Sequence, residues 1–252
     1  MNFKKSAFEK LSWFSSEFVV VVSGVLVALA LNGWWQGIQD QRAEEAYLNQ
    51  LVAELSSSIE TMSIDSTRSH EAQATLSKVI RAFRSNDSPP VDSVAAWMFQ
   101  GLQFFVTGVS IGTLEAIVSS EDFQLIRSDT LRSRLPVFLA LSKTGNARMH
   151  RLEEFFISEI RDLYQVVDYA GLVQLTSSDS TIAAMASSNS YFRIPPDGKR
   201  LWLGAPLHEI FEDENAYASF NYIHDINSIL IQIRASLLSE SRNTLSLISS
   251  EQ

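Results

Sequence analysis

The segment Gly108-Val109-Ser110-Ile111-Gly112 is the pattern in this sequence most typical of a catalytic site. Its Gly-x-Ser-x-Gly spacing matches the turn that exposes a serine nucleophile in α/β hydrolases, where a strand precedes the serine and a helix follows it. Residues 102–106 can form that strand, but no alternating strands and helices nearby supply a parallel sheet. We therefore interpret the segment as a turn between two short helices, with hydrolysis by Ser110 as a distant alternative.

Metal and cofactor chemistry has little support in the sequence. The chain has no cysteine, and no two of its four histidines have the spacing of three or four residues typical of a zinc site on a helix. The densest group of ligand types is better explained as a hydrated acidic surface: His208, Glu209, Glu212, Asp213 and Glu214. Four aromatic residues favour core packing over a ligand pocket: Trp97, Phe99, Phe104 and Phe105. We expect no metal, no cofactor and no enzymatic activity.

The stretch 18–35 (FVVVVSGVLVALALNGWW) is strongly apolar and carries no charge. As a helix these 18 residues would be about 27 Å long, close to the roughly 30 Å hydrocarbon core of a bilayer. Trp13 and Trp34 near its two ends suit the two membrane interfaces. We interpret the stretch as a transmembrane helix. The alternative is a signal peptide cut after Ala28-Leu29-Ala30, although the apolar character continues beyond that site.

The charges around this stretch predict its orientation. Three lysines lie in the first ten residues, whereas Arg42 is the only cation in the 20 residues after the stretch. Because positive side chains stay on the cytoplasmic side, we expect a short cytoplasmic tail at 1–17 and an extracytoplasmic helical domain at 36–252. The chain has a net charge of −9, and its first 17 residues hold three lysines and two glutamates, so the outer domain carries −10. Such an acidic surface disfavours nucleic acid as a partner.

Six residues are candidates for contact with the membrane or with a partner: Glu17, Ser23, Gly24, Asn32, Trp34 and Trp35. Glu17 is a carboxylate at the cytoplasmic edge of the span, where it either stays hydrated or meets a partner within the membrane. Ser23 and Gly24 form a notch of small side chains that can seat another helix. Asn32, Trp34 and Trp35 lie at the outer end of the span, near the membrane interface.

Helical periodicity and end signals predict an all-α fold outside the membrane. No proline lies between the span and Ser85, so a long helix at 39–85 can continue directly from the span. Another long helix at 213–248 begins after Asp213 as N-cap, and we expect the two to pack antiparallel in a helical bundle. Shorter helices are expected between them: at 94–105 after Ser93, at 113–119, from Ser128 onward with a kink at Pro136, and at 146–173. The turn signal Pro195-Pro196-Asp197-Gly198 allows a small β-hairpin near 191–203.

Apolar residues of the last helix alternate at spacings of three and four, which is typical of a coiled-coil seam: Phe220, Ile223, Ile226, Leu230, Ile233 and Leu237. Two interpretations stay open. Either the seam packs inside its own bundle against the long helix, or it pairs between copies in a homo-oligomer. The polar run from Asp65 to Gln73 interrupts the apolar stripe of the long helix. In the second interpretation this run is a solvated part of a stalk or a contact for a partner.

Two stretches carry a family resemblance. Residues 17–34 contain Glu-Phe-Val-Val-Val-Val and end with Val-Ala-Leu-Ala-Leu-Asn-Gly-Trp, and residues 113–132 contain Phe-Gln-Leu-Ile-Arg-Ser-Asp. They resemble a family of uncharacterised bacterial single-pass membrane proteins, although Ser120-Glu121 stands where that family has Ser-Gly and Gly33 where it has a second Asn. The resemblance implies a helical domain anchored in the bacterial inner membrane. It implies no activity, and no functional residue can be carried over from it.

These observations favour a membrane-anchored interaction or scaffold protein, as a component of an envelope complex with a protein partner. The basis is the absence of a convincing catalytic constellation and a cytoplasmic tail too short for an output domain. The alternative is a ligand-binding sensor module that signals through a membrane partner, with Glu17 as a contact.

Overall fold

The computed structural model describes residues 3–85, 89–164, 167 and 210–251. Every regular element in these ranges is helical, which confirms the all-α class for them. The elements are α1 (Phe3–Phe83), α2 (Val91–Gly101), α3 (Gly112–Ser119), the 3₁₀ helix η1 (Glu121–Leu125), α4 (Asp129–Leu163) and α8 (Glu214–Glu251). The hairpin that the sequence allows near 191–203 lies outside the described residues.

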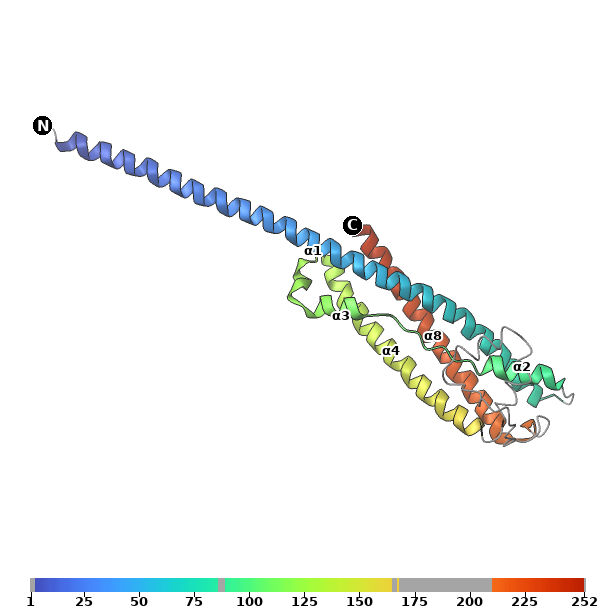
Figure 1. The fold of residues 1–252 in the computed structure, drawn as a ribbon. Coiled ribbons are helices and arrows are strands. Elements are labelled where there is room, and N and C mark those ends of the chain that lie inside the picture. Colours follow the sequence, from blue (N-terminus) through green and yellow to red (C-terminus); the bar gives the residue numbers. More distant parts are fainter. Residues whose placement is uncertain (1–2, 86–88, 165–166, 168–209, 252) are drawn as a thin grey trace, which may run out of the picture.

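Helix α1 runs unbroken from the apolar stretch to the far end of the molecule (Figure 1). Its 81 residues would be about 120 Å long at the usual rise of a helix. The first part projects alone, and the remainder, from Gly37 onward, contacts the other helices. We call this remainder, together with α2, α3, η1, α4 and α8, the helical body. The expected continuation of the apolar stretch into the long helix is confirmed.

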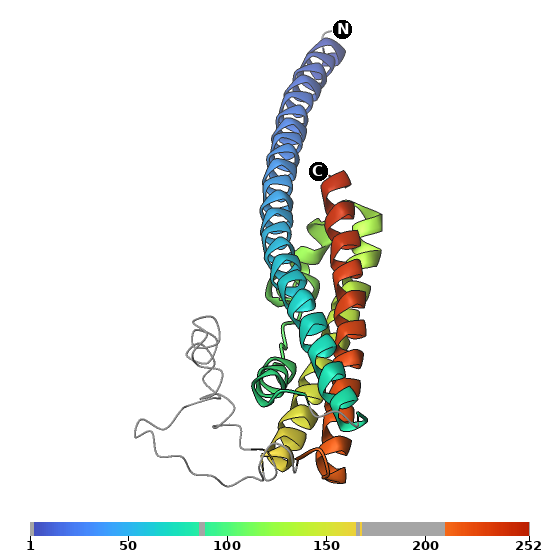
Figure 2. The same ribbon diagram turned by 90° about the vertical axis from the view of Figure 1, so that its right-hand side faces the viewer.

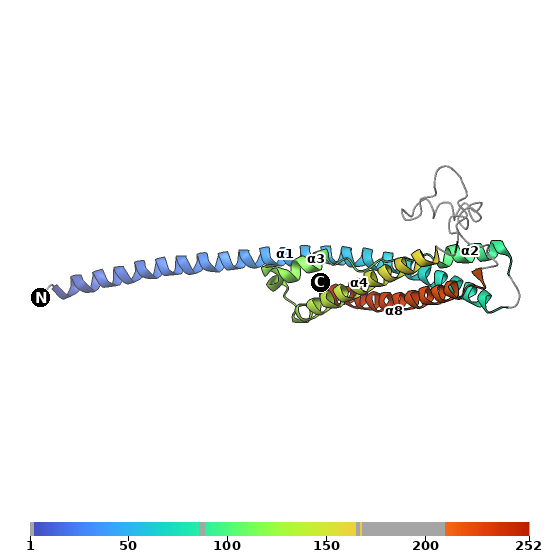
Figure 3. The same ribbon diagram turned by 90° about the horizontal axis from the view of Figure 1, so that it is seen from below.

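Helices α1, α4 and α8 lie side by side along the helical body (Figures 2 and 3). At its far end the rings of Phe83 and Phe220 are 5.7 Å apart. Toward the projecting part of α1, Arg242 Nη2 donates to Ser63 Oγ over 3.2 Å. Because the residue numbers rise along α8 as they fall along α1, the two helices are antiparallel, as the sequence predicts. Helix α2 covers α1 at the far end, and α3 and η1 lie at the end nearest the projecting part.

One apolar core joins these helices. Leu51, Leu55, Leu76, Phe138 and Phe220 are all fully buried within it. Five of the six seam residues of α8 are also buried within a single chain: Phe220, Ile223, Ile226, Leu230 and Leu237. The seam is therefore already covered by α1 and α4, and pairing it between copies would require the helical body to open.

Some element boundaries differ from those expected. Helix α4 is one helix of 35 residues containing Pro136, whereas we expected a second helix to begin at Asn146. Gly145, the residue before Asn146, is buried, and a Cβ on it would lie 2.8 Å from Cδ2 of Leu237. Gly145 is therefore needed for close approach of α8 rather than for a break in the chain. Helix α2 begins at Val91 without a side-chain cap and ends at Gly101, so Ser93 is not its N-cap.

Candidate functional site

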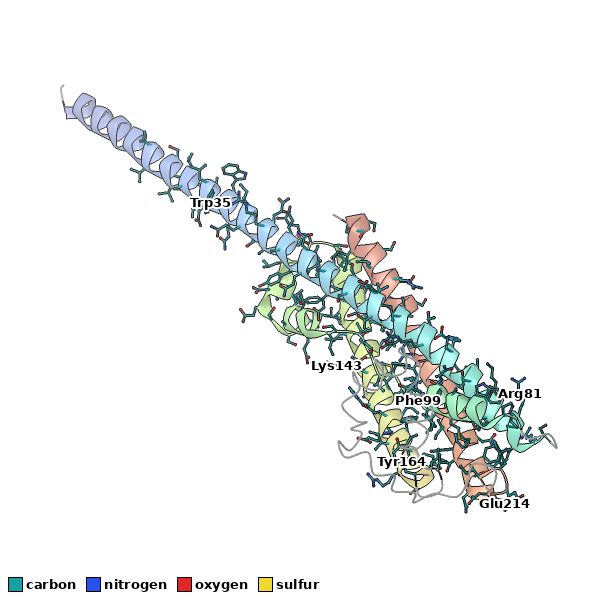
Figure 4. The ribbon with its side chains drawn as sticks, turned by 45° about the vertical axis from the view of Figure 1, so that its right-hand side comes forward. Trp35, Arg81, Phe99, Lys143, Tyr164 and Glu214 are labelled. Atoms are coloured by element: carbon teal, nitrogen blue, oxygen red, sulfur yellow. The ribbon has the colours of Figure 1, made fainter. Side chains whose placement is uncertain are left out.

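The apolar stretch of α1 contacts no other part of the described chain. Among the described residues α1 alone is long and apolar enough to cross a membrane, and none of its most apolar window is buried. Trp34 and Trp35 are 66% and 55% exposed, and Figure 4 shows Trp35 on the projecting part, away from the helical body. This stretch is therefore not a core helix of its own chain, and membrane lipid or a partner would cover it.

The other anchor candidates differ in their surroundings. Ser23 Oγ donates to the carbonyl of Val20 over 3.0 Å, so its hydroxyl is satisfied within the helix. A Cβ on Gly24 would meet nothing within 4 Å, and the carboxamide of Asn32 makes no hydrogen bond to the described residues. The structure describes the backbone of Glu17 within α1 but not its side chain, so its predicted contact lies outside the described side chains.

Gly24 and Asn32 lie on the face of α1 that points away from the helical body. The 18 residues from Gly24 to Arg42, or from Asn32 to Gln50, make about five full turns, so each pair shares one side of the helix. Arg42 and Gln50 are exposed, while Leu51 and Leu55 face the core. The helical body therefore leaves access to this side of the apolar stretch.

At the base of the helical body, where α1 enters it, a group of polar contacts joins α1 to η1 and to the segment before α4. We call this group the clasp: Gly37, Glu44, Tyr47, Asp122 and Arg127. Arg127 Nη2 donates to the carbonyl of Gly37 over 3.0 Å. Glu44 accepts from the backbone N–H of Arg127 over 2.7 Å and forms an ion pair with its Nε at 3.5 Å. Tyr47 donates to Asp122 over 2.6 Å, and this hydrogen bond raises the pKa of Tyr47. The clasp fixes the link between η1 and α4 against α1.

The Gly-x-Ser-x-Gly segment is held by the carboxylate of Glu54. Ser110 Oγ donates to Glu54, which also accepts from the backbone N–H groups of Gly112 and Thr113 over 2.9 Å each. The N–H of Ser110 donates to Ser58 Oγ over 3.0 Å. No histidine among the described residues contacts Ser110, and the preceding segment is not a strand. Ser110 and Glu54 together fasten the start of α3 to α1.

Gly108, the first glycine of this segment, has a packing role. A Cβ on it would lie 2.1 Å from Oδ1 of Asn146. The Asn146 side chain accepts from the N–H of Val109 over 3.1 Å and donates to its carbonyl over 2.8 Å. The segment thus bridges α1 and α4, because side chains of these two helices satisfy its backbone polar groups.

We expect the Glu54 contact to make stability depend on pH. Partial burial raises the pKa of Glu54, but hydrogen bonds from Ser110, Thr113 and Gly112 lower it more, so the pKa falls below its ordinary value of 4.5. A lowered pKa stabilises the fold above the unfolded-state value, and this contribution is lost as pH falls through the folded-state pKa. Glu54→Gln should therefore cost about 1–2 kcal/mol near neutral pH, and much less in acid.

The measurement is urea unfolding of the full chain, followed by far-UV circular dichroism over a series of pH values. Glu60→Gln is the matched control, because Glu60 is exposed on the same helix. The free energy of unfolding could instead differ between Glu54→Gln and wild type by the same amount down to pH well below 4.5. That result would show that the carboxylate form of Glu54 is not the form that stabilises α3.

A buried arginine is the largest polar feature of the helical body. Arg234 of α8 is 0% exposed and its Nη1 donates to the carbonyl of Asp65 over 3.0 Å and to Ser69 Oγ over 2.7 Å. Its Nη2 donates to the carbonyl of Phe105. The Asp65 carboxylate accepts from Thr107 and forms an ion pair with Arg68 at 3.6 Å. Burial lowers the pKa of Arg234, whereas the nearby Asp65 charge raises it.

Further polar pairs continue this line between α1 and α8, and we call the whole line the polar layer. Asn227 donates to the carbonyl of Ser69 over 3.2 Å, and Gln73 donates to Ser228. One face of residues 65–73 is buried, since Asp65 and Ser69 are only 6% and 1% exposed, whereas Arg68 and Glu71 on the other face are exposed. The apolar stripe of α1 is interrupted at residues 65–73 because the residues of α8 that contact them, Arg234 and Asn227, are also polar. The sequence signal for this pairing is the presence of Arg234 and Asn227 among the apolar seam residues of α8.

The remaining sequence candidates are packed, lie outside the described residues or, like Glu212 and Glu214, are exposed at the surface. The ring of Phe104 stacks on that of Phe156 at 4.3 Å, and Phe99 is 1% exposed, so these aromatic residues belong to the core. No group of three or more metal-ligand residues occurs in the part of the chain that the structure describes. His208 and Glu209 are outside that part.

Comparison with protein-family models, curated proteins and solved structures finds no match for the chain. Function must therefore be argued from the chain's own geometry.

Proposed function

We propose that this protein is a membrane-anchored helical interaction module, a component of an envelope complex of the bacterial inner membrane. In this proposal residues 1–17 lie in the cytoplasm, residues 18–35 span the membrane, and the helical body stands outside. The lysines before the span and the acidic chain after it support this orientation.

The observation that carries the proposal is the unbroken α1, which joins an exposed apolar helix to the far end of the helical body. Helix α1 from Gly37 to Phe83 would extend about 70 Å at the usual rise of a helix. With the clasp at its base, the helical body is a stiff support that holds its far end at a fixed distance from the anchor. Such a support suits a protein that positions a partner.

A sensor module that signals through a membrane partner is the second candidate, and the polar layer is the observation that favours it. The centre of the α1–α8 contact consists of hydrogen-bonded groups such as Ser69 and Arg234 rather than interlocked apolar side chains alone. Discrete hydrogen-bond partners can be exchanged between two arrangements of a helix pair. Because α1 is continuous, such a change would reach the anchor and Glu17.

The experiment is extraction of the full chain from its native membrane in mild detergent, followed by native mass spectrometry. We expect the uncleaved chain of 28.2 kDa together with a second membrane protein in fixed stoichiometry. A chain beginning near Leu31 would contradict the anchor and favour a cleaved signal peptide. A chain with a bound small molecule and no second protein would favour the sensor. An assembly containing only copies of this chain would support the homo-oligomer.

A further inference from the structure

The clasp places part of the helical body at the height of the membrane surface. The uncharged span ends at Trp35, and only two residues later the carbonyl of Gly37 accepts from Arg127 over 3.0 Å. Two residues of helix rise about 3 Å, whereas the polar region beyond the hydrocarbon core is about 5–7 Å thick on each side. Arg127 therefore lies within the outer headgroup region whenever the tryptophans occupy the interface.

The surface beside Arg127 has the chemistry of phospholipid headgroups. The Arg127 side chain is 53% exposed despite its contacts in the clasp, and that of Asp129 is 88% exposed. A guanidinium binds phosphate through paired N–H donors, and a carboxylate can accept from a headgroup ammonium. Two cations lie here beside two carboxylates, because Arg132, which is 42% exposed, forms an ion pair with Asp129 as Arg127 does with Glu44. This balance of charge matches a zwitterionic headgroup better than an anionic lipid, which would favour a cluster of basic residues.

The clasp also explains why this surface stays in place. Glu44 holds both the backbone and the side chain of Arg127, and Tyr47 holds Asp122 in η1. Figures 1 and 3 show η1 and the start of α4 at the end of the helical body nearest the projecting helix. The segment is thus fixed toward the bilayer rather than tethered loosely near it.

We infer that residues 124–129 form a second membrane contact, docked on zwitterionic phospholipid headgroups with Arg127 on lipid phosphate. This inference rests on the proposed anchor. It adds that the helical body has no free stalk and stands directly on the outer leaflet, so that rotation of the anchor turns the whole body.

The chain has no cysteine, so single cysteines can carry nitroxide labels without background. We would label Gln124→Cys and Asp129→Cys in full-length protein in vesicles of phosphatidylethanolamine and phosphatidylcholine. Val27→Cys reports the hydrocarbon core, and Ala218→Cys, exposed on α8 at the far end, reports bulk water. Collisions with a water-soluble nickel chelate should fall several-fold at positions 124 and 129 relative to 218.

Equal nickel accessibility at positions 124, 129 and 218, with Val27→Cys protected, would overturn the inference and leave the anchor intact. Nickel access at Val27→Cys would overturn the anchor and the inference together. The phosphate contact has its own readout, since nitrogen–phosphorus dipolar NMR should detect a guanidinium near lipid phosphorus. That signal should fall in Arg127→Lys and persist in Arg148→Lys, because Arg148 is exposed farther along α4. An unchanged signal in Arg127→Lys would overturn the assignment to Arg127.

Discussion

Replacing Arg234 by methionine should destabilise the helical body by about 3–5 kcal/mol, because three buried acceptors would lose their donor at a cost of about 1–3 kcal/mol each. Methionine fills much of the same volume but donates no hydrogen bond. The carbonyls of Asp65 and Phe105 and the hydroxyl of Ser69 would all lose the donor they have in the native protein. A buried polar group without a partner costs more than the mean value of its hydrogen bond, because its desolvation is then uncompensated.

The measurement is urea unfolding of the full chain in detergent, followed by far-UV circular dichroism. Arg242→Met is the matched control, because Arg242 is exposed on the same helix and makes one contact, to Ser63 Oγ at 3.2 Å. We expect the control to change stability by no more than about 0.5 kcal/mol. Similar urea midpoints for the two variants would show that the polar layer is not a source of stability.

Local sequence signals were sufficient for the ends and the continuity of several helices. Ser128 Oγ accepts from the N–H of Leu131 over 3.3 Å at the start of α4, as its position predicts. Asp213 accepts from the N–H groups of Asn215 and Ala216 over 2.8 and 2.9 Å at the start of α8. These caps depend on residues close in sequence, so their chemistry can be read without knowing the fold.

Features that depend on a distant partner could not be read in the same way. Gly145 and Asn146 are residue types that often end helices, yet α4 continues through both. Gly145 leaves space for the side chain of Leu237 on α8, and the Asn146 side chain accepts from the backbone N–H of Val109. The polar run at 65–73 is equally ambiguous. Asp65 and Ser69 would be solvated on a free helix, and they are buried only because α8 brings Arg234 against them.

The candidate site shows the same division. The exposed apolar part of α1 follows from composition alone, because a candidate membrane span requires only length and apolar character. The clasp does not, since Glu44 and Arg127 are separated by more than 80 residues and each is an ordinary surface type. Only the antiparallel return of the chain places them together at the base of the helical body.

Replacing Ile226 by glutamate should unfold the helical body, or destabilise it by several kilocalories per mole, because an unpaired charge would be buried. Ile226 is 3% exposed and belongs to the core between α1, α4 and α8. Ile229 is the matched control, because it lies one helical turn away on α8 but is 43% exposed. Ile229→Glu should leave both the circular dichroism spectrum and the urea midpoint close to those of wild type.

The same pair of variants decides how the apolar seam is used. If the seam packs within one chain, Ile226→Glu should lose helical circular dichroism signal and unfold at a lower urea concentration than wild type, whatever the protein concentration. If it pairs between copies, Ile226→Glu gives a folded monomer, and light scattering in detergent shows a smaller particle than wild type. A folded, monomeric Ile226→Glu protein would contradict the structure, because Ile226 would then have no buried place in a single chain. We expect the first outcome, since the neighbouring seam residues Ile223 and Leu230 are also buried within one copy.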